Sequence, residues 1–241
     1  MQLSVIVPVM NEADNVAPLA HEIFTALQDR VDFEVLFIDD GSTDATLAQL
    51  QMARAELGAR LRILKHPRNA GQSAAIVSGA RAARGIWLAT LDGDGQNDPN
   101  DIIKLFAQVQ TQGEPEPILL AGQRVRRQDS VGKLVASRIA NQVRARLLHD
   151  ETPDTGCGLK ILPRELFLEL PYFDHMHRFL PALVLRAGGR VTSIPVNHRP
   201  RAAGQSKYGL SNRLWVGITD LLGVLWLQRR ARLPRGVTEI L

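Results

Sequence analysis

Several features that define common classes of protein are scarce in this 241-residue sequence. It has one cysteine, Cys157, which excludes an internal disulfide and indicates a reducing compartment. Aromatic residues make up only 5% and are not interleaved with the basic residues, which argues against a nucleic-acid partner. The amino terminus enters a hydrophobic run without a basic region or a cleavage site, so we expect no signal peptide.

No apolar run is long enough to cross a membrane as a helix. The longest, residues 214–227, is interrupted by Asp220, whereas a spanning helix needs roughly 20 apolar residues. On a helical wheel an apolar stripe with tryptophans at one edge precedes the segment RRARLPR; it consists of Leu214, Trp215, Ile218, Leu221, Leu222, Leu225 and Trp226. This pattern predicts a helix lying in a membrane interface. A helix packed on the protein's own core, or a dimer contact, is the alternative.

Three common nucleotide-binding and hydrolase signatures are also missing. The sequence contains no GxxxxGK[ST], GxGxxG or GxSxG, so neither a P-loop NTPase, a typical dinucleotide fold nor a serine hydrolase is supported. The net charge is +4, and arginines cluster within 124–127 and 229–235. Such clusters indicate phosphate-bearing ligands or an anionic membrane, with a solvated basic surface as the alternative.

What the sequence does contain is a regular alternation of short apolar strands and helices. We predict strands at 3–9, 33–39, 61–65, 86–91 and 117–124. We predict helices at 15–28, 44–56, 73–84 and 100–112. Because the strands are apolar throughout, the pattern predicts an α/β fold with a mostly parallel sheet flanked by helices.

The alternation ends after Arg124. We predict one long helix at 131–148, a glycine-rich loop entering a strand at 154–162, a helix at 178–189 and a strand at 190–200. A basic loop then precedes the C-terminal amphipathic helix. Since no proline- or serine-rich linker occurs, we predict one domain over 1–209 and a C-terminal helix and tail over 210–241.

Acidic and amide side chains follow three of the predicted strands. They are Asn11 and Glu12 after the first, Asp39 and Asp40 after the second, and Asp92 and Asp94 after the fourth. Ligands of open α/β sheets bind at the carboxyl ends of the strands, so these groups are expected to converge on one cleft. For DDGSTD, a turn followed by a helix cap is an equally good interpretation.

The segment LDGDGQNDPND tests two kinds of cation site. A calcium loop counted from Asp92 would need Gly at position six and Glu at twelve, but Asn97 and Ile103 stand there. In an extended segment Asp92 and Asp94 project to the same side, so both carboxylates can face one cation. Mg²⁺ is commonly held by one or two carboxylates and substrate phosphates, so a diphosphate carried on a metal fits this arrangement.

Five segments together resemble family 2 glycosyltransferases, most closely the polyprenyl-phosphate glycosyltransferases of the dolichol-phosphate mannosyltransferase type. They are VIVPVMNEADNV, FIDDGSTDAT, NAGQSAAIVSGARAARG, LDGDGQNDPNDI and DTGCGLK. The resemblance implies a GT-A (Rossmann-like) fold, a nucleotide-sugar donor such as GDP-mannose or a UDP-sugar, inversion at the anomeric carbon, and Mg²⁺ or Mn²⁺. It also implies a polyprenyl phosphate acceptor.

The resemblance assigns roles to individual residues. The nucleoside pocket would be lined by Pro8, Glu12, Ile38 and Asp40. The DxD motif corresponds to Asp92, Gly93 and Asp94, and the metal and diphosphate would be surrounded by Asp92, Asp94 and Gln96. Donor and acceptor phosphates would be held by Arg124 and Arg138, with Lys207 on a loop that closes over the diphosphate. Asp154 would orient the acceptor-side loop, and the catalytic set would be Asp94, Arg124, Arg138 and Asp154.

The sequence departs from the family pattern in two places. The triplet is DGD where DAD is commoner, which we expect mainly to add backbone freedom at Gly93. The acidic ED base motif is replaced by HMHRF, which suits a phosphate acceptor, because a phosphate is already ionised near neutral pH. The QxxRW motif is absent, which favours transfer of a single sugar.

The expected partners are a nucleotide sugar, a polyprenyl phosphate and a membrane surface, with a homo-oligomer left open. We expect a cytoplasmic protein peripherally associated with the cytoplasmic face of the membrane. The alternatives are a glycosyltransferase with another cell-envelope acceptor and a non-catalytic GT-A-like protein of a membrane assembly. A nucleotidyltransferase is disfavoured, because its glycine-rich basic N-terminal loop is missing.

Overall fold

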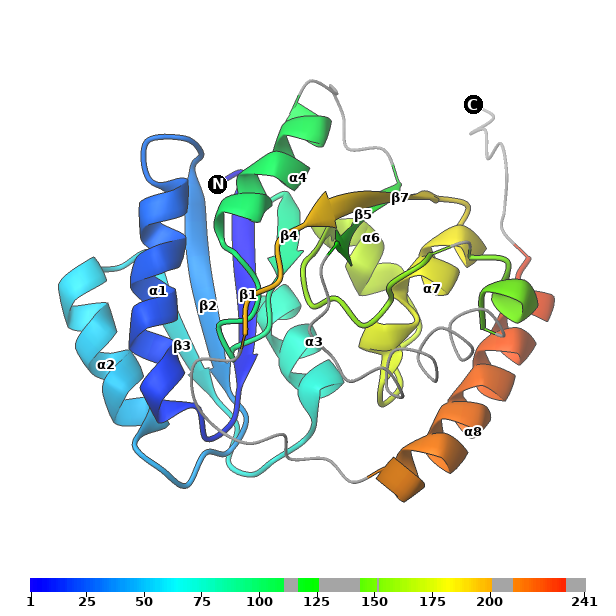
Figure 1. Cartoon of the computed structure of the whole chain (residues 1–241), viewed down its shortest axis with the longest axis horizontal. Helices are drawn as coiled ribbons and strands as arrows, with labels where there is room; N and C mark the ends of the chain where they lie inside the picture. The colour runs from blue at the N-terminus through cyan, green and yellow to red at the C-terminus, as the bar shows by residue number, and fades with distance from the viewer. Residues whose placement is uncertain (111–116, 126–143, 151, 201–209, 233–241) are drawn as a thin grey trace, which may run out of the picture.

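The computed structural model describes residues 1–110, 117–125, 144–150, 152–200 and 210–232, with the backbone alone at 110 and 210–216 (Figure 1). A seven-stranded sheet has the order β3-β2-β1-β4-β6-β5-β7. Its strands are β1 (Leu3–Val9), β2 (Phe33–Asp39), β3 (Leu61–Lys65), β4 (Trp87–Thr90), β5 (Ile118–Arg124), β6 (Lys160–Pro163) and β7 (Arg190–Val196). Only β6 pairs antiparallel with its neighbours, β4 and β5, so the predicted mostly parallel α/β sheet is confirmed.

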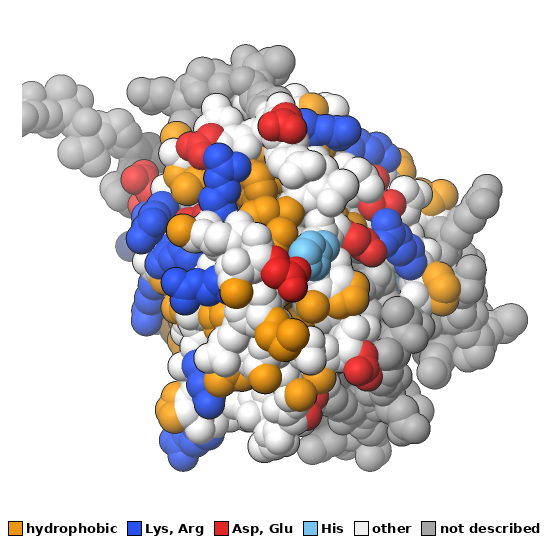
Figure 2. All heavy atoms as spheres, turned by 90° about the vertical axis from the view of Figure 1, so that its left-hand side faces the viewer, with side chains coloured by type: hydrophobic (Ala, Val, Ile, Leu, Met, Phe, Trp, Pro, Cys, Tyr) orange, Lys and Arg blue, Asp and Glu red, His pale blue; other side chains and the backbone are white. Residues whose placement is uncertain are grey.

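Helices cover both faces of this sheet (Figure 1). One face packs against α1 (Ala13–Leu27), α2 (Thr46–Leu57) and α4 (Asn100–Gln110). The other packs against α3 (Gln72–Ala82), α6 (Arg164–Glu169), α7 (Leu180–Arg186) and α8 (Leu210–Arg229). Figure 2 shows the side of the molecule that lies at the left of Figure 1, where acidic and basic side chains are interspersed. That side of the surface carries both signs of charge.

The strand sequences are apolar throughout because both faces of the sheet are buried. On β1, Val5 and Val7 belong to the core on the α1 side, whereas Ile6 between them belongs to the core on the α3 side. This alternation follows from the two-residue period of a strand. The predicted limits of β2 and β3 are confirmed.

The structure differs from the prediction at several helix limits. The helix predicted at 178–189 is shorter in the structure: α7 covers Leu180–Arg186, with Pro181 in its first turn, and a separate 3₁₀ turn, η1 (Met176–Arg178), precedes it. Proline lacks the N–H that a helix interior needs, so it favours a new helix start there. Most of the helix predicted at 131–148 lies outside the described residues. Among the described helices, none has the length and apolar character needed to span a bilayer.

A buried glutamate on β2 was not anticipated from the sequence. The carboxylate of Glu34 accepts hydrogen bonds from Ser4 Oγ at 2.7 Å, Arg62 Nη1 at 2.8 Å and the Arg84 amide at 2.6 Å. Burial alone would raise the pKa of Glu34, but these bonds outweigh it and lower the pKa below 4.5. The cluster ties β1, β2 and β3 to the turn before β4.

The apolar residues of α8 are divided between the core and the surface. Val224 is buried, and Leu221 and Leu225 pack against the core on the α3 side. Ile218, Leu222 and Trp226 are 41%, 61% and 60% exposed and lie four residues apart on one outer face. We call these three residues the α8 outer face. The single stripe predicted from the helical wheel is therefore split between two directions.

Candidate active site

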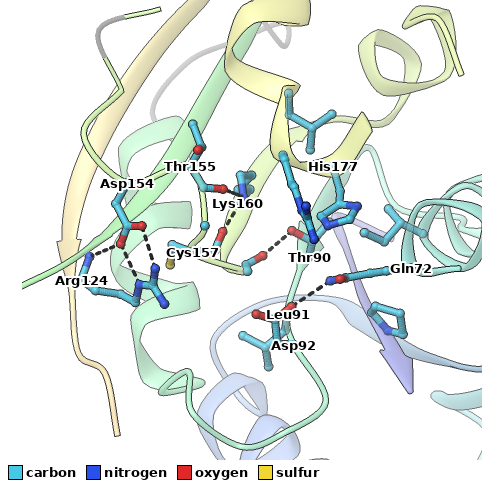
Figure 3. A pocket seen from close by; sticks show the side chains of 16 residues that line it. Gln72, Thr90, Leu91, Asp92, Arg124, Asp154, Thr155, Cys157, Lys160 and His177 are labelled. Carbon is cyan, nitrogen blue, oxygen red and sulfur yellow. Dashed lines mark hydrogen bonds and ion pairs between the residues drawn. The ribbon is translucent and has the colours of Figure 1, made fainter. Parts of the chain in front are cut away.

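A cavity of about 400 Å³ opens at the carboxyl edge of the sheet. Its walls come from the ends of β1, β4 and β5, the first turns of α3, the loop 154–158, and the segment from η1 into α7 (Figure 3). The convergence of β1, β4 and β5 at this edge agrees with the rule for open α/β sheets. Its volume falls in the range of about 300–1,000 Å³ typical of small-molecule sites.

Asp92 lies in this cavity directly beneath the loop 154–158. Gln72 Nε2 donates to Asp92 Oδ1 at 3.0 Å, and Thr90 Oγ1 donates to the Gly158 carbonyl at 2.6 Å. A Cβ on Gly158 would lie 2.3 Å from Asp92 Oδ2, so the loop backbone packs on the carboxylate. Burial, and then the charge of Asp94, raise the pKa of Asp92 to about 6. A bound cation would reverse this effect, and two carboxylates are a donor set that suits Mg²⁺ or Mn²⁺.

Glycine at position 93 has a packing reason that the sequence did not indicate. A Cβ there would lie 2.5 Å from Val9 Cγ1 and 3.0 Å from the Pro8 carbonyl oxygen. Gly93 is not among the glycines with positive φ. The end of β1 therefore approaches the DGD backbone too closely for a side chain at its middle position.

Arg124 and Asp154 form a two-point ion pair on another wall of the cavity. Arg124 Nε donates to Asp154 Oδ2 at 2.7 Å, and Nη2 donates to Oδ1 at 2.8 Å (Figure 3). Burial would lower the pKa of Arg124, but the bond to Asp154 outweighs it and raises the pKa. The pair joins the end of β5 to the start of the loop 154–158. It fixes the guanidinium plane while leaving other N–H groups for a ligand.

Lys160 is a cavity residue to which the sequence assigned no role. Its side chain is 4% exposed, and Nζ donates to the carbonyl oxygens of Thr155, at 3.2 Å, and Cys157. Burial lowers the pKa of Lys160. The motif DTGCGLK ends with this lysine, but nothing in the motif shows that the lysine side chain points into the protein.

His177 is a second cavity residue that sequence reasoning left unused. Its Nδ1 lies 2.8 Å from Ser73 Oγ, on the first turn of α3. Burial, and then the charges of Arg178 and Lys160, lower the pKa of His177 to about 3, so the ring is neutral at physiological pH. His175 turns elsewhere and pairs with Asp220 on α8 at 3.1 Å. The described residues contain no cluster of three metal-binding side chains.

The residues expected around the nucleoside occupy different surroundings. Pro8 lines the cavity. Ile38 is fully buried in the core beneath α3 and does not line the cavity. Asp40 accepts hydrogen bonds from the amides of Ala70 at 2.9 Å and Gly71 at 2.8 Å, so it shapes the turn before α3.

Two neighbouring acids complete this region. Glu12 Oε2 accepts a hydrogen bond from Asn15 Nδ2 at 2.7 Å. Asp39, next to Asp40, is fully buried, and its Oδ2 has no hydrogen-bond partner among the described residues. A buried carboxylate oxygen of this kind needs an explanation, and a ligand donor would supply one. The position of Asp39 beside Asp40 in DDGSTD indicated a role at the strand end. The sequence does not show which of these two acids forms internal hydrogen bonds.

Two of the remaining expected residues lie beside the cavity and two cannot be placed. Asp94 Oδ1 accepts from the Gln96 amide at 3.2 Å, and the Gln96 side chain donates to the Arg199 carbonyl at 3.3 Å. Neither Asp94 nor Gln96 lines the cavity. Arg138 and Lys207 lie outside the described residues.

The sheet and its edge cavity define a GT-A-like protein. A crystal structure of glucosyl-3-phosphoglycerate synthase from Mycobacterium tuberculosis, in complex with Mn²⁺, UDP and glucosyl-3-phosphoglycerate, has the same fold with a TM-score of 0.68. The alignment covers 94% of this chain and 79% of that one at 17% identity. A second structure, described as a mycobacterial protein, has a TM-score of 0.66 at 21% identity over 94% of this chain and 74% of that one. These structures establish the fold alone.

Residues 4–170 match the model of glycosyl transferase family 2, and the chain belongs to this family. It is 37% identical to the dodecaprenyl-phosphate galacturonate synthase of Rhizobium johnstonii, over 97% of this chain and 69% of the relative. It is 33% identical to the undecaprenyl-phosphate 4-deoxy-4-formamido-L-arabinose transferase of Aeromonas hydrophila, over 86% of this chain and 63% of the relative. The chain thus spans about two thirds of the length of these relatives.

Proposed function

We propose that this chain transfers a single sugar from a nucleotide-sugar donor to a polyprenyl phosphate, with inversion at the anomeric carbon. The observation that carries the proposal is the cavity that brings Asp92 together with the Arg124–Asp154 pair. This arrangement offers a cation site and a fixed guanidinium to the same diphosphate. The names of the two relatives support a polyprenyl phosphate as the acceptor.

Asp92 and Asp94 would hold Mg²⁺ or Mn²⁺, and Gln96 stays in the set on the family resemblance alone. The bound ion would neutralise charge on the leaving nucleoside diphosphate. Arg124, whose guanidinium plane is fixed by Asp154, would bind the same diphosphate. By resemblance, Arg138 and Lys207 would bind it as well. A well-placed group of this kind stabilises a transition state by roughly 3–4 kcal/mol. By resemblance, Pro8, Glu12 and Asp40 would receive the nucleoside.

His177 supports a phosphate acceptor because it is a poor proton acceptor. An efficient general base has a pKa near the working pH, and the pKa of His177 is lowered to about 3. A sugar hydroxyl would need its proton removed during attack. A polyprenyl phosphate presents an oxygen that is already ionised, so the transfer needs no base in this position.

The acceptor lipid places the reaction at a membrane surface, and the α8 outer face suits that location. Its three exposed apolar residues are followed by exposed arginines, Arg229 and Arg230. Apolar contact together with attraction to anionic lipid is how interfacial helices bind. We therefore propose peripheral attachment through α8, at the cytoplasmic face. The names of the relatives differ in the sugar, so they leave its class open.

The proposal is tested by transfer of sugar to undecaprenyl phosphate from UDP- and GDP-sugars with Mn²⁺. We expect a lipid-linked product that is lost on adding EDTA. Asp94→Ala should lower turnover at least about 100-fold, within the range for loss of one electrostatic contact. Asp14→Asn, which changes an exposed carboxylate on α1, is the matched control. Near-normal turnover of Asp94→Ala with added Mn²⁺ would remove the metal site.

A further inference from the structure

Lys160 presents a buried amino group to the cavity, without a direct carboxylate partner among the described residues. Its Nζ donates to the backbone carbonyls of Thr155 and Cys157, and among the described residues no carboxylate oxygen forms an ion pair with it. An ammonium group has three donors, so one remains after these two bonds. Burial without a counter-ion disfavours the charged form of an amine, so an anion supplied by a ligand would stabilise the ammonium form of Lys160.

The other charged side chains described in the cavity do not supply an anion to Lys160. Asp154 is bound at two points to Arg124. Asp92 accepts a hydrogen bond from Gln72 and would bind the metal under the proposed function. Burial lowers the pKa of Lys160, and the charges of Asp92 and Asp154 act against that effect without reversing it. Once a divalent ion takes up the charge of Asp92, the positive charge near Lys160 is larger still.

The position of Lys160 indicates which part of the substrate reaches it. The diphosphate would lie at Asp92 and Arg124, and the nucleoside toward Pro8 at the end of β1. The cavity continues past Asp92 to Lys160, with Thr155 and Cys157 on one side and His177 on the other (Figure 3). The part of a donor beyond its diphosphate is the sugar, so under the proposed function the sugar would occupy this space.

This end of the cavity is closely enclosed. Lys160, Thr90 and Leu180 are only 4%, 3% and 1% exposed. A phosphate that carries a polyprenyl chain needs room for the chain to leave, whereas a carboxylate on a sugar ring ends there. The neutral His177 ring adds hydrogen-bonding capacity without adding charge, which suits the hydroxyl groups of the same sugar.

We propose that Lys160 binds a carboxylate carried by the donor sugar, so that the enzyme uses a nucleotide-linked hexuronic acid. This inference rests on the proposed function and adds the class of sugar. Lys160 acts as a specificity-determining residue that distinguishes a C6 carboxylate from a C6 hydroxymethyl group. Its contacts with the loop 154–158 hold the ammonium in position for this contact.

The test compares donors that differ only at C6. The pairs are UDP-galacturonate with UDP-galactose, UDP-glucuronate with UDP-glucose, and GDP-mannuronate with GDP-mannose, each with Mn²⁺ and undecaprenyl phosphate. The wild-type protein should favour the acid in at least one pair by roughly tenfold or more in kcat/KM, since a lost charged hydrogen bond costs about 1.5–3 kcal/mol. Lys160→Gln should bring that ratio close to one, and Lys160→Arg should retain a preference for the acid.

The ratio of kcat/KM for the acid donor to that for the neutral donor separates sugar recognition by Lys160 from a purely structural role of this residue. A lysine that only anchors the loop would lower kcat/KM for both donors of a pair equally, and an unchanged ratio in Lys160→Gln overturns the inference. Lys104→Gln is the matched control, because exposed Lys104 also donates to a backbone carbonyl, that of Pro195, away from the cavity. It should leave both the rates and the ratio as in the wild type.

The remaining outcomes are also decisive. If Lys160→Gln raises the KM for undecaprenyl phosphate and leaves the sugar ratio unchanged, Lys160 serves the acceptor and the inference is wrong. If the wild-type protein transfers the neutral sugar of every pair at least as well as the acid, the inference fails while the proposed function stands, whether or not the variants fold. If neither UDP nor GDP with Mn²⁺ raises the Tm and no donor reacts, the proposed function fails and the inference fails with it.

Discussion

Two glycines at the site, Gly93 and Gly158, allow backbone segments to pack closely around the DGD motif. Gly93 fits against the end of β1, and Gly158 lies directly over the carboxylate of Asp92. Neither has a positive φ, so their value lies in the missing side chain. The sequence shows both glycines, but only the fold shows what each one touches.

Gly158→Ala should therefore damage the site more than the fold. The new Cβ would lie 2.3 Å from Asp92 Oδ2 and would displace that carboxylate or the loop above it. We expect a loss of roughly 1–3 kcal/mol in stability from overpacking and about 100-fold in turnover from misplacement. Urea unfolding and the transfer assay measure the two effects. Gly223→Ala on α8, where nothing lies within 4 Å of the added Cβ, should show neither loss.

Glu34 gives a second prediction at the level of a single residue. Removing it in Glu34→Ala leaves Ser4 Oγ, Arg62 and the Arg84 amide without their acceptor. We expect a loss toward the lower end of roughly 3–5 kcal/mol, since Arg62 keeps some contact with water. Equilibrium unfolding in urea at pH 7 measures it, and an unchanged midpoint would contradict the assigned role.

The pH dependence of stability should also report on Glu34. Because its folded pKa is lowered, the unfolded chain binds more protons, and stability rises with pH between the folded pKa and the ordinary value of 4.5. The contribution is complete above pH 4.5 and is lost as the pH falls through the folded pKa. Glu34→Gln should flatten this part of the profile. A slope equal to that of the wild-type protein would mean that other acids produce it.

At the level of the elements, prediction worked best where local pattern and burial agree. β2 and β3 have the predicted limits, because an apolar run bounded by turn residues leaves little choice. The antiparallel direction of β6 was not predictable, since it depends on pairing with β4 and β5, far away in sequence. The two-way division of the α8 side chains was also missed, because a helical wheel shows one stripe and cannot show what covers it.

The α8 outer face gives a prediction for this element. The double substitution Leu222→Glu and Trp226→Glu should reduce binding to liposomes containing anionic lipid by at least about tenfold, since it removes exposed apolar contacts and adds repulsion. Flotation measures the bound fraction. Met52→Glu on α2, which changes a side chain that is 59% exposed, is the control. Equal flotation of all three proteins would exclude α8 as the attachment surface.

At the level of the whole molecule, the cavity is assembled from segments that are distant in the sequence. Asp92, Arg124 and Asp154 could be predicted because each belongs to a motif with a recognisable spacing. Lys160, His177 and the Asp39 oxygen that no described residue bonds could not, because their roles depend on which neighbours the fold brings to them. Site residues that lie at a strand end could thus be predicted from the sequence. Site residues whose side chains turn inward could not.

Donor binding should stabilise the whole fold. At 100 times its Kd, a nucleoside diphosphate with Mn²⁺ adds about 2.7 kcal/mol, which corresponds to a rise of several degrees in Tm for a chain of this size. Screening UDP and GDP by thermal shift identifies the base. EDTA should abolish the shift, and an equal shift without metal would contradict a metal-held diphosphate.

The contact between His175 and Asp220 links α8 to the wall of the cavity. These two side chains lie 3.1 Å apart, and His177 follows in the same short turn of chain. Because His177 lines the cavity, α8 contacts the same short segment that supplies part of the cavity wall. The helix proposed to lie on the lipid and a wall of the proposed donor cavity thus share one short stretch of chain.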